Sequence, residues 1–319
     1  MGPQIIFRAD ASVAIGTGHI MRCLTLADAL SAAGAQVEFA CSAETLAIVP
    51  RLDASPYAIV SDDKGGDLLI IDHYGLGPEY ERKARTRYHR VMVIDDLPER
   101  PHECDLLLDQ TFGRIAEQWK PFVPSTTRVL AGTDYLLLRP EFVQTCPPRK
   151  TLKSILITLG GTDPNNATGI ALDGIKRSGL DVAVNVVMGV QAPHLNAILT
   201  KAETMDKVRV HIDANCMADL MIHSDLAIGA GGTTAWERCC LGLPSIVLQI
   251  AANQRDVVQA LTQAEAAVEC ALDANEIAAT LRSIPKSLFH LSQCASRICT
   301  GDGTNRTAQA ILTLLRVHP

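Results

Sequence analysis

Short apolar runs alternate with helix-type patterns along the whole chain of 319 residues. In the first half, the runs contain consecutive apolar residues, which is typical of parallel strands that are buried on both faces. Strands are predicted at 5–8, 36–41, 67–72, 90–95, 105–108 and 128–130, with helices at 19–33 and 77–87. This repetition of strand, loop and helix predicts a mostly parallel sheet with helices on both faces.

A proline-containing segment at 139–151 interrupts the pattern, which restarts at residue 154. Further strands are predicted at 154–159, 182–188, 208–212, 226–229 and 245–249, with a last helix at 306–316. We therefore expect two Rossmann-like doubly wound α/β domains, 1–145 and 146–319, and the last helix is a candidate to pack back on the first domain. Two such domains that face a cleft would bind ligands where the carboxyl ends of their strands converge.

The amino-acid composition and net charge indicate which kinds of partner the protein can bind. Hydrophobic residues make up 47% and charged residues 20% of the chain, as in a folded globular protein. The net charge of −6 and the 4% aromatic content argue against nucleic acid or an anionic membrane as the main partner. No apolar run of about 18 residues and no signal peptide is visible, so we expect a cytoplasmic protein. The ten cysteines form no C-x-x-C pair and are expected in the core.

The first candidate motif joins the end of a strand to the start of a helix through the glycines Gly16 and Gly18. His19 is expected in the first turn of that helix, where the positive end of the helix favours the neutral imidazole that a general base requires. Asp10 could orient the ring or the attacking water. The alternatives are that His19 only caps the helix, or that the glycines bind phosphate without chemistry. Substrate-binding candidates in this segment are Arg8, Gly16, Thr17, Gly18 and Arg22.

A second candidate segment follows the strand at 67–72. Asp72 and Tyr74 are expected to face His19 across the end of the sheet, which makes Tyr74 a catalytic candidate beside His19 and Asp10. The alternative is that Tyr74 is a residue at the edge of the core.

Three motifs in the second half are typical of nucleotide and sugar binding. In the first, glycines open a helix whose free N–H groups suit a diphosphate, and Glu237 could accept both hydroxyls of a ribose; the alternative is a capping turn with a solvated Glu237. In the second, small residues leave room for a phosphate or sugar, or form a turn that Asp163 caps. In the third, neutral amides could read sugar hydroxyls, or Asn253 is an N-cap. The first motif contains Gly231, Gly232, Thr233, Thr234 and Glu237. The second contains Gly160, Gly161, Thr162 and Asp163, and the third contains Asn253 and Gln254.

Other segments carry weaker signals. The run His102-Glu103-Cys104 contains metal-ligand types, but consecutive residues rarely bind one ion, which favours a surface loop. The basic residues between 82 and 90 indicate a solvated helix face rather than a lipid contact. The motifs of serine hydrolases, zincins and P-loop proteins are absent from the sequence.

Taken in order, the motifs resemble the PseG family, the UDP-sugar hydrolases of pseudaminic acid biosynthesis, a nonulosonic acid pathway. The family acts on UDP-2,4-diacetamido-2,4,6-trideoxy-β-L-altropyranose. The resemblance extends almost from end to end. It is carried by Arg8-x-Asp10, Ile15-Gly16-Thr17-Gly18-His19, Asp72-x-Tyr74, Val93-Ile94-Asp95-Asp96, Leu138-Arg139-Pro140-Glu141, Gly160-Gly161-x-Asp163, Gly231-Gly232-x-Thr234-x-Trp236-Glu237, Leu241-Gly242-Leu243-Pro244 and Ala252-Asn253-Gln254.

The resemblance implies a fold like that of the GT-B glycosyltransferases, with UDP held by the C-terminal domain and the sugar held against the N-terminal domain. It implies hydrolysis without a metal or cofactor, in which water attacks the anomeric carbon with C–O cleavage and inversion. His19 matches the family's general base, and Tyr74 and Asn253 match positions that contact sugar or phosphate. We expect the UDP-sugar and UDP as the partners, with no nucleic acid or membrane, and we expect a monomer.

The chain departs from the family at its tail, where Asp302-Gly303-Thr304-Asn305-Arg306 replaces an Asp-Gly-x-Gly-x-x-Arg pattern. Two alternatives to the hydrolase remain from the sequence: a GT-B glycosyltransferase that uses a UDP-sugar donor, and a non-catalytic module that binds sugar nucleotides.

Overall fold

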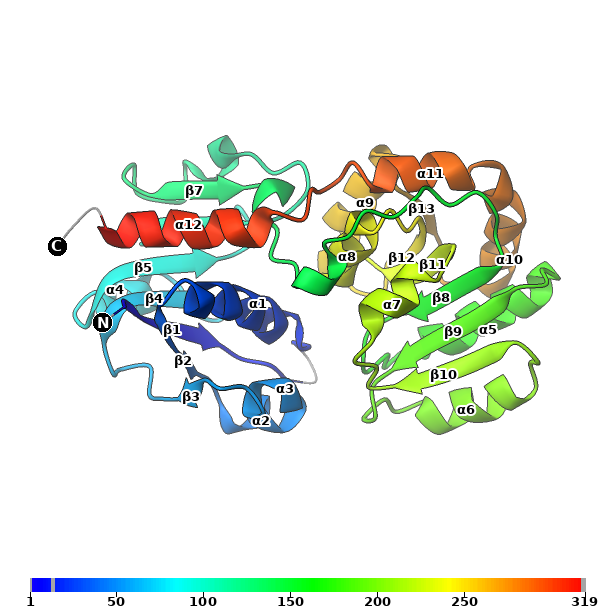
Figure 1. Ribbon diagram of the computed structural model, residues 1–319, viewed down its shortest axis with the longest axis horizontal. Coiled ribbons are helices and arrows are strands. Elements are labelled where there is room, and N and C mark those ends of the chain that lie inside the picture. The colour runs from blue at the N-terminus through cyan, green and yellow to red at the C-terminus, as the bar shows by residue number, and fades with distance from the viewer. Residues whose placement is uncertain (1, 13–14, 317–319) are drawn as a thin grey trace. The chain divides into compact units, whose positions relative to one another are not determined.

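The structure, a computed structural model, describes residues 2–12 and 15–316. The chain divides into two compact units (Figure 1). Unit 1 contains residues 1–139 and 301–319, and unit 2 contains residues 140–300. Unit 1 is therefore built from both ends of the chain, and unit 2 lies between them in the sequence.

Unit 1 is built on a seven-stranded parallel sheet in the order β3-β2-β1-β4-β5-β6-β7. Its strands are β1 (Gln4–Ala9), β2 (Gln36–Ala40), β3 (Ala58–Ile59), β4 (Gly66–Asp72), β5 (Tyr88–Ile94), β6 (Leu106–Asp109) and β7 (Arg128–Ala131). Its helices are α1 (Gly18–Ala32), α2 (Ala43–Ile48), α3 (Pro50–Asp53), α4 (Pro78–Ala84) and α12 (Gly303–Arg316), with 3-10 turns η1 (Ala116–Trp119) and η2 (Thr133–Tyr135).

Both faces of this sheet are buried, which explains the continuous apolar runs in the sequence. Along β1, Ile5 and Phe7 join the core beneath α1 and α12, whereas Ile6 belongs to the core on the opposite face, with Trp119. Figure 1 shows α1 and α12 on one face of the sheet, where the two helices pack against each other.

The start of α12 is fixed tightly to unit 1. A Cβ atom on Gly303 would lie 2.2 Å from the backbone nitrogen of Leu136, so only glycine fits. The Thr304 hydroxyl accepts a hydrogen bond from the Leu138 N–H and lies 3.0 Å from the Leu138 carbonyl oxygen. The tail that departs from the family pattern thus docks the last helix onto the segment after β7.

Unit 2 has a six-stranded parallel sheet in the order β10-β9-β8-β11-β12-β13. The strands are β8 (Ser154–Thr158), β9 (Ala183–Met188), β10 (Val208–Ile212), β11 (Leu226–Ala230), β12 (Ser245–Leu248) and β13 (Ala267–Cys270). The helices are α5 (Ala167–Ser178), α6 (Leu195–Glu203), α7 (Met217–Ile222), α8 (Thr234–Cys240), α9 (Arg255–Gln263), α10 (Ala274–Ser283) and α11 (Leu288–Ala295), with 3-10 turns η3 (Pro140–Phe142), η4 (Ala252–Gln254) and η5 (Ile284–Lys286).

The two faces of this sheet are again both covered. Ile155 and Ile157 of β8 pack into the core that α5 and α10 cover, and Leu156 between them packs on the other face with Phe142. Within the described parts of the chain, no helix is both long enough and apolar enough to cross a membrane.

Each sheet has a topological switch point, where the strand order reverses direction. In unit 1 it lies between β1 and β4, and in unit 2 between β8 and β11. Open α/β sheets bind ligands outside the carboxyl ends of the strands at such points. The predicted fold class is confirmed: both units are doubly wound parallel α/β folds.

Candidate active site

The first group of predicted residues lies at the switch point of unit 1. The loop after β1 leads into α1, whose second residue is His19, and β4 ends at Asp72, followed by Tyr74. Parallel pairing places Ala9 of β1 beside Asp72 of β4, so both loops emerge at the same edge of the sheet. The expectation that Asp72 and Tyr74 face His19 is confirmed.

Asp72 is the centre of a buried cluster of charges. His19 Nδ1 lies 2.5 Å from Asp72 Oδ1, and Arg22 binds both carboxylate oxygens at 2.6 Å. Burial alone would raise the pKa of Asp72, but Arg22 and His19 outweigh it and hold that pKa well below its usual range. Asp72 is therefore an ionised acceptor at neutral pH.

This carboxylate fixes the tautomer of His19. Because an ionised carboxylate only accepts hydrogen bonds, the proton of a neutral imidazole resides on Nδ1 and is donated to Asp72. Nε2 then carries a free lone pair, and among the described residues it has no hydrogen-bond partner. The geometry thus leaves Nε2 free to accept a proton or a hydrogen bond, with Asp72 held at the opposite ring nitrogen.

Tyr74 is held edge-on against the His19 ring, with ring centroids 4.9 Å apart. Its hydroxyl donates to Asp96 at 2.7 Å, and Arg100 lies over its ring and hydrogen-bonds its carbonyl oxygen. Burial, followed by the charge of Asp96, raises the pKa of Tyr74, so its phenol stays protonated. Tyr74 can therefore donate or pack against a ligand but does not act as a base.

A small pocket of about 50 Å³ opens at this switch point. Its volume is enough for a few water molecules. His19, Asp72 and Tyr74 line it together with Asp10, Ile15, His73 and Gly75. The residues of the charge cluster thus border a space that can hold water.

The structure corrects the expected partner of the His19 ring. Asp10 does not touch that ring; it pairs with Arg8 at 2.7 Å and accepts from the Ser42 N–H. Asp10 follows β1 directly, whereas Asp72 ends the neighbouring strand and projects beneath the first turn of α1. The other proposed role of Asp10, positioning water, stays a prediction, since Asp10 lines the pocket.

His73 also lines the pocket, but both of its ring nitrogens are occupied. Nδ1 accepts from the Gly75 N–H at 2.9 Å, and Nε2 lies 3.4 Å from Asp10. Burial and then the nearby Arg8 lower the pKa of His73. Of the two histidines at the pocket, His19 is the one with a nitrogen available to a substrate.

The remaining residues of the first motif shape the loop. The Gly16 N–H donates to the Ser12 carbonyl at 2.8 Å, Thr17 is the N-cap residue of α1 without a side-chain cap bond, and Gly18 begins the helix. Arg22 was predicted as a substrate contact, but it is buried, and its Nε and Nη2 atoms both bind Asp72. Its observed contacts are those of a residue that positions Asp72.

In unit 2, the glycine-containing loop follows β11 at the switch point, and Thr233 is the N-cap residue of α8. A Cβ on Gly231 would lie 2.8 Å from the Val258 side chain, so this glycine is required by packing. Gly232 has no atom within 4 Å of that position, which leaves its backbone open to a ligand. Glu237, the fourth residue of α8, is partly exposed, as a ribose contact requires.

Arg238 adds a cation beneath this loop, which the sequence did not reveal as part of a site. It is completely buried and donates to the Ala230 carbonyl and the Ser245 hydroxyl, both at 2.9 Å. Burial lowers the pKa of Arg238 to about 10, so the group is still charged at neutral pH. A buried positive charge beneath this loop favours an anion.

The loop after β8 contains Gly160, Gly161 and Thr162 at the same switch point. Here the alternative of a capping turn describes Asp163 correctly. Its two carboxylate oxygens accept from the N–H groups of Ala167 and Thr168 at 2.8 Å, and its side chain is buried. The structure therefore gives Asp163 a role in holding α5, and the glycines before it stay predicted phosphate or sugar contacts.

The third motif of unit 2 forms the 3-10 turn η4. The Gln254 amide oxygen accepts from the Ile250 N–H at 3.1 Å, so in this structure that side chain closes its own turn. The predicted role of the Asn253 side chain lies outside what the structure describes.

His102 contradicts an expectation drawn from the sequence, and Glu81 is its partner. His102 was expected in a surface loop, but it is buried, as is Glu81 of α4. The His102 ring lies between Glu81 at 2.7 Å and Asp95 at 3.1 Å, and Asp95 also binds Arg100 beneath Tyr74. Glu81 is the helix position that faces the sheet, a signal that helical periodicity could have revealed.

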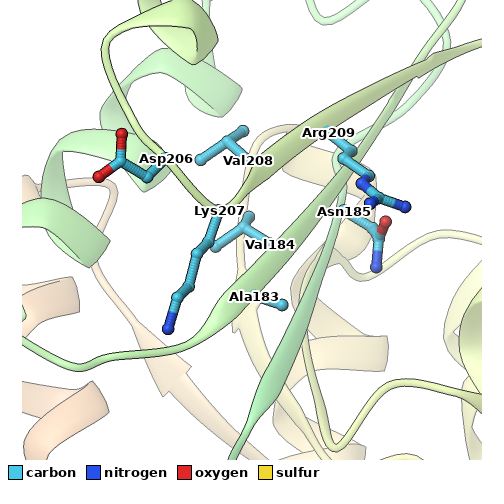
Figure 2. A pocket seen from close by; sticks show the side chains of 7 residues that line it. All are labelled: Ala183, Val184, Asn185, Asp206, Lys207, Val208 and Arg209. Atoms are coloured by element: carbon cyan, nitrogen blue, oxygen red, sulfur yellow. The ribbon is translucent and has the colours of Figure 1, made fainter.

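A larger cavity of about 450 Å³ lies elsewhere in unit 2 (Figure 2). Its lining includes Asn185, Lys207 and Arg209 at the amino ends of β9 and β10. Ligands of open α/β sheets bind at the opposite, carboxyl ends. Because no predicted site residue lines this cavity, it is not the candidate active site.

Solved structures share this fold along nearly the whole chain. MurG of Acinetobacter baumannii superposes with a TM-score of 0.68 at 15% identity, over 97% of this chain and 99% of MurG. The calicheamicin glycosyltransferase CalG4 superposes with a TM-score of 0.64 at 15% identity, over the full length of both chains. The protein therefore has the GT-B glycosyltransferase fold.

Three curated proteins are similar in sequence. The UDP-2,4-diacetamido-2,4,6-trideoxy-beta-L-altropyranose hydrolase of Campylobacter jejuni is 28% identical over 70% of this chain and 84% of its own length. The spore coat polysaccharide biosynthesis protein SpsG of Bacillus subtilis is 27% identical over 83% and 82%, respectively.

The uncharacterized protein MJ1062 of Methanocaldococcus jannaschii is 26% identical over 79% of this chain. The alignment spans only 57% of the length of MJ1062. No family model matches the chain. The sequence is thus related to a group that includes the hydrolase and SpsG.

Proposed function

We propose that this protein is a UDP-sugar hydrolase that releases UDP from UDP-2,4-diacetamido-2,4,6-trideoxy-β-L-altropyranose, in the biosynthesis of pseudaminic acid. Support comes from the Campylobacter relative, which bears the name of this hydrolase, and from the GT-B fold. Unit 1 supplies the base and sugar contacts, and unit 2 binds the UDP part. The protein acts in the cytoplasm as a monomer, and its reaction uses no metal or cofactor.

The observation that carries the proposal is the pair of His19 and Asp72. The Asp72 carboxylate accepts a hydrogen bond from Nδ1–H, which leaves the Nε2 lone pair at the border of a water-sized pocket. In the proposed reaction, water attacks the anomeric carbon, Nε2 accepts its proton, and the bond from that carbon to the diphosphate oxygen breaks. A positioned base of this kind contributes roughly 10²–10⁴-fold to the rate.

The leaving group in this proposal is UDP held by unit 2. The open backbone at Gly232 and the buried charge of Arg238 both favour the negative charge that develops on the diphosphate. Glu237 accepts the ribose hydroxyls. If water and His19 lie on the face of the sugar opposite UDP, the product has the inverted anomeric configuration.

The test is an NMR time course with the purified chain, the UDP-sugar and water alone. We expect free UDP to accumulate and the first sugar product to carry the inverted configuration. A lack of UDP release in the absence of an acceptor, or retention of configuration, contradicts the proposal.

A second candidate is a GT-B glycosyltransferase that transfers the sugar to an acceptor, and the solved structures with this fold favour it. Turnover that depends on an added lipid or sugar acceptor selects this candidate. A module that binds UDP without any turnover is the third reading, and it is selected when UDP binds but neither water nor acceptor reacts.

A further inference from the structure

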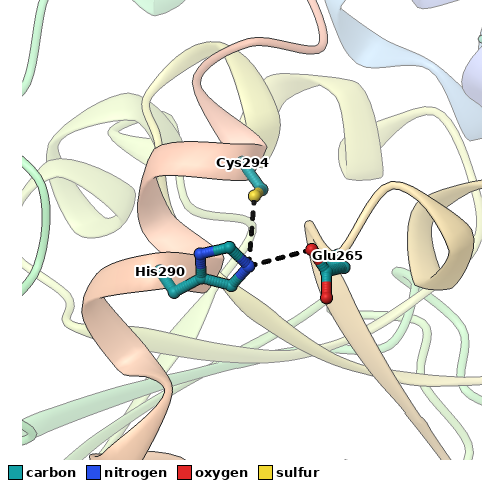
Figure 3. A group of neighbouring side chains, drawn as sticks. All are labelled: Glu265, His290 and Cys294. Carbon is teal, nitrogen blue, oxygen red and sulfur yellow. Dashed lines mark hydrogen bonds and ion pairs between the residues drawn. The ribbon is translucent and has the colours of Figure 1, made fainter.

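A group of three different metal-ligand side chains lies on the surface of unit 2 (Figure 3). His290 and Cys294 are four residues apart on α11, so they project from the same side of the helix. Glu265 comes from the turn between α9 and β13. Figure 3 shows its carboxylate directed at the His290 ring, with the sulfur of Cys294 facing the same ring nitrogen.

We propose that Glu265, His290 and Cys294 form a binding site for a divalent transition metal of the Zn²⁺ type. The three ligand atoms already lie within 4.8 Å of one another. His290 Nε2 is 2.9 Å from Glu265 Oε2 and 3.7 Å from Cys294 Sγ. Zinc at its usual bond lengths of about 2.0–2.3 Å separates tetrahedral ligand atoms by about 3.3–3.7 Å. Small rotations of exposed side chains are therefore enough to coordinate one ion.

The donor set determines which ion fits. A thiolate and an imidazole are ligands for zinc, cobalt or copper, whereas magnesium and calcium prefer oxygen ligands alone. On metal binding, the thiol proton is released to solvent, and any proton on His290 Nε2 moves to Nδ1 or to solvent, so that the ion takes the place of the hydrogen bond between His290 and Glu265. The exposure of these two side chains, 57% and 68%, leaves a fourth position for water.

The backbone places Glu265 against the helix. Its φ of +54° is a left-handed conformation that residues other than glycine rarely adopt. An ion at this site connects the turn before β13 to α11, two segments separated by more than twenty residues. Because metal binding then favours the folded form, it stabilises unit 2.

Cobalt is a suitable probe because its thiolate complexes absorb light. Titration of the full-length chain with Co²⁺ alone is expected to give a thiolate-to-metal charge-transfer band that saturates at one equivalent, and Zn²⁺ is expected to displace it. Cys294→Ser should abolish the band. His290→Gln should keep the thiol but weaken Co²⁺ binding at least about 10-fold. The matched controls are Cys216→Ser and His223→Gln, which change an exposed cysteine and an exposed histidine elsewhere in unit 2.

A second measurement identifies the thiol directly. Zn²⁺ should slow alkylation of Cys294, read by peptide mass spectrometry, and should leave alkylation of Cys216 unchanged. The proposal is overturned by the absence of a saturable band, by a band that persists in Cys294→Ser, by a band lost in Cys216→Ser, or by unchanged affinity in His290→Gln. Circular dichroism of each variant confirms that it is folded.

Discussion

Arg22 binds Asp72 through two nitrogen atoms, each 2.6 Å from a different carboxylate oxygen. The two residues come from α1 and β4, so the ion pair ties the helix that carries His19 to the strand that carries its partner. A bidentate pair of this kind is strong and directional. Its consequence is that Asp72 stays ionised and that its oxygen remains in place to accept the hydrogen bond from the Nδ1–H group of His19.

Replacement of Asp72 by Asn tests this arrangement. The amide can offer an N–H group to Nδ1, which moves the imidazole proton to Nε2 and removes the free lone pair. We expect kcat for UDP release to fall by about 10²–10⁴-fold, because catalysis by the positioned base is lost. UDP affinity, measured by calorimetry, should stay unchanged, since unit 2 binds UDP in the proposal. His19→Asn should give the same result.

These two variants also have a clear contrary outcome. If Asp72→Asn and His19→Asn turn over at the parental rate, then His19 is not the base. A parallel loss of UDP binding would instead show a general disruption. Tyr74→Phe is the milder comparison, because it keeps the ring against His19 and removes only the bond to Asp96.

Glu237→Ala should weaken UDP binding more than it slows chemistry. Loss of hydrogen bonds from a charged acceptor to the ribose costs about 1.5–3 kcal/mol, which corresponds to about 10- to 150-fold in Kd. Calorimetry with UDP measures the first effect, and kcat at saturating substrate measures the second. Glu203→Ala, at an exposed position at the end of α6, is the control. Unchanged UDP affinity in Glu237→Ala would refute the ribose contact.

The buried His102 should make stability depend on pH. Burial alone would lower the pKa of His102, but the carboxylates of Asp95 and Glu81 outweigh it and raise the pKa to about 9, from an ordinary 6.5. A raised folded-state pKa contributes stability that is complete below pH 6.5 and is lost as pH rises through 9. Relative to the parent, His102→Gln should therefore be most destabilised near pH 6 and less so near pH 9.5.

Thermal unfolding at the two pH values measures this difference. The control is His89→Gln, because His89 is 82% exposed beside Asp67 and its loss should change little at either pH. An equal deficit of His102→Gln at both pH values would mean that the ring contributes by packing rather than by charge.

Gly303→Ala should lower the stability of unit 1. The added methyl group would lie 2.2 Å from the Leu136 backbone nitrogen, so α12 must shift away from its docking segment. Such overpacking costs about 1–3 kcal/mol. Hydrogen exchange should rise in α1 and β1 and stay unchanged in the sheet of unit 2. Gly77→Ala is the control, since the space around its Cβ position is open; an equal effect of the two variants would argue against the docking role.

Much of the architecture follows from hydrophobic patterning, because strands buried on both faces give continuous apolar runs. The runs at 67–72 and 154–159 correspond to β4 and β8 within one residue at each end. β3 was not predicted, because its two residues are exposed and too few for a pattern. β13 was not predicted either, since a glutamate interrupts it.

The candidate site was predictable in part. The motif signals placed His19 at the start of a helix, and Tyr74 beside it, because both follow strand ends of a parallel sheet. The sequence did not show which carboxylate binds the His19 ring. Asp10 directly follows β1 and Asp72 ends β4, so both lie at the same edge of the sheet. Arg22 and Arg238 look like ligand-binding or solvent-exposed cations in a sequence, and only packing shows that they are buried.

The return of the chain to unit 1 through α12 has a consequence for the order of events during synthesis. The ribosome completes residues 140–300 before it makes the helix that covers part of the first sheet beside α1. Unit 2 can therefore complete its packing before unit 1 does. Until α12 is synthesised, apolar side chains on one face of the unit 1 sheet stay uncovered. Release of the last helix is the step that covers this surface, because α12 packs against α1.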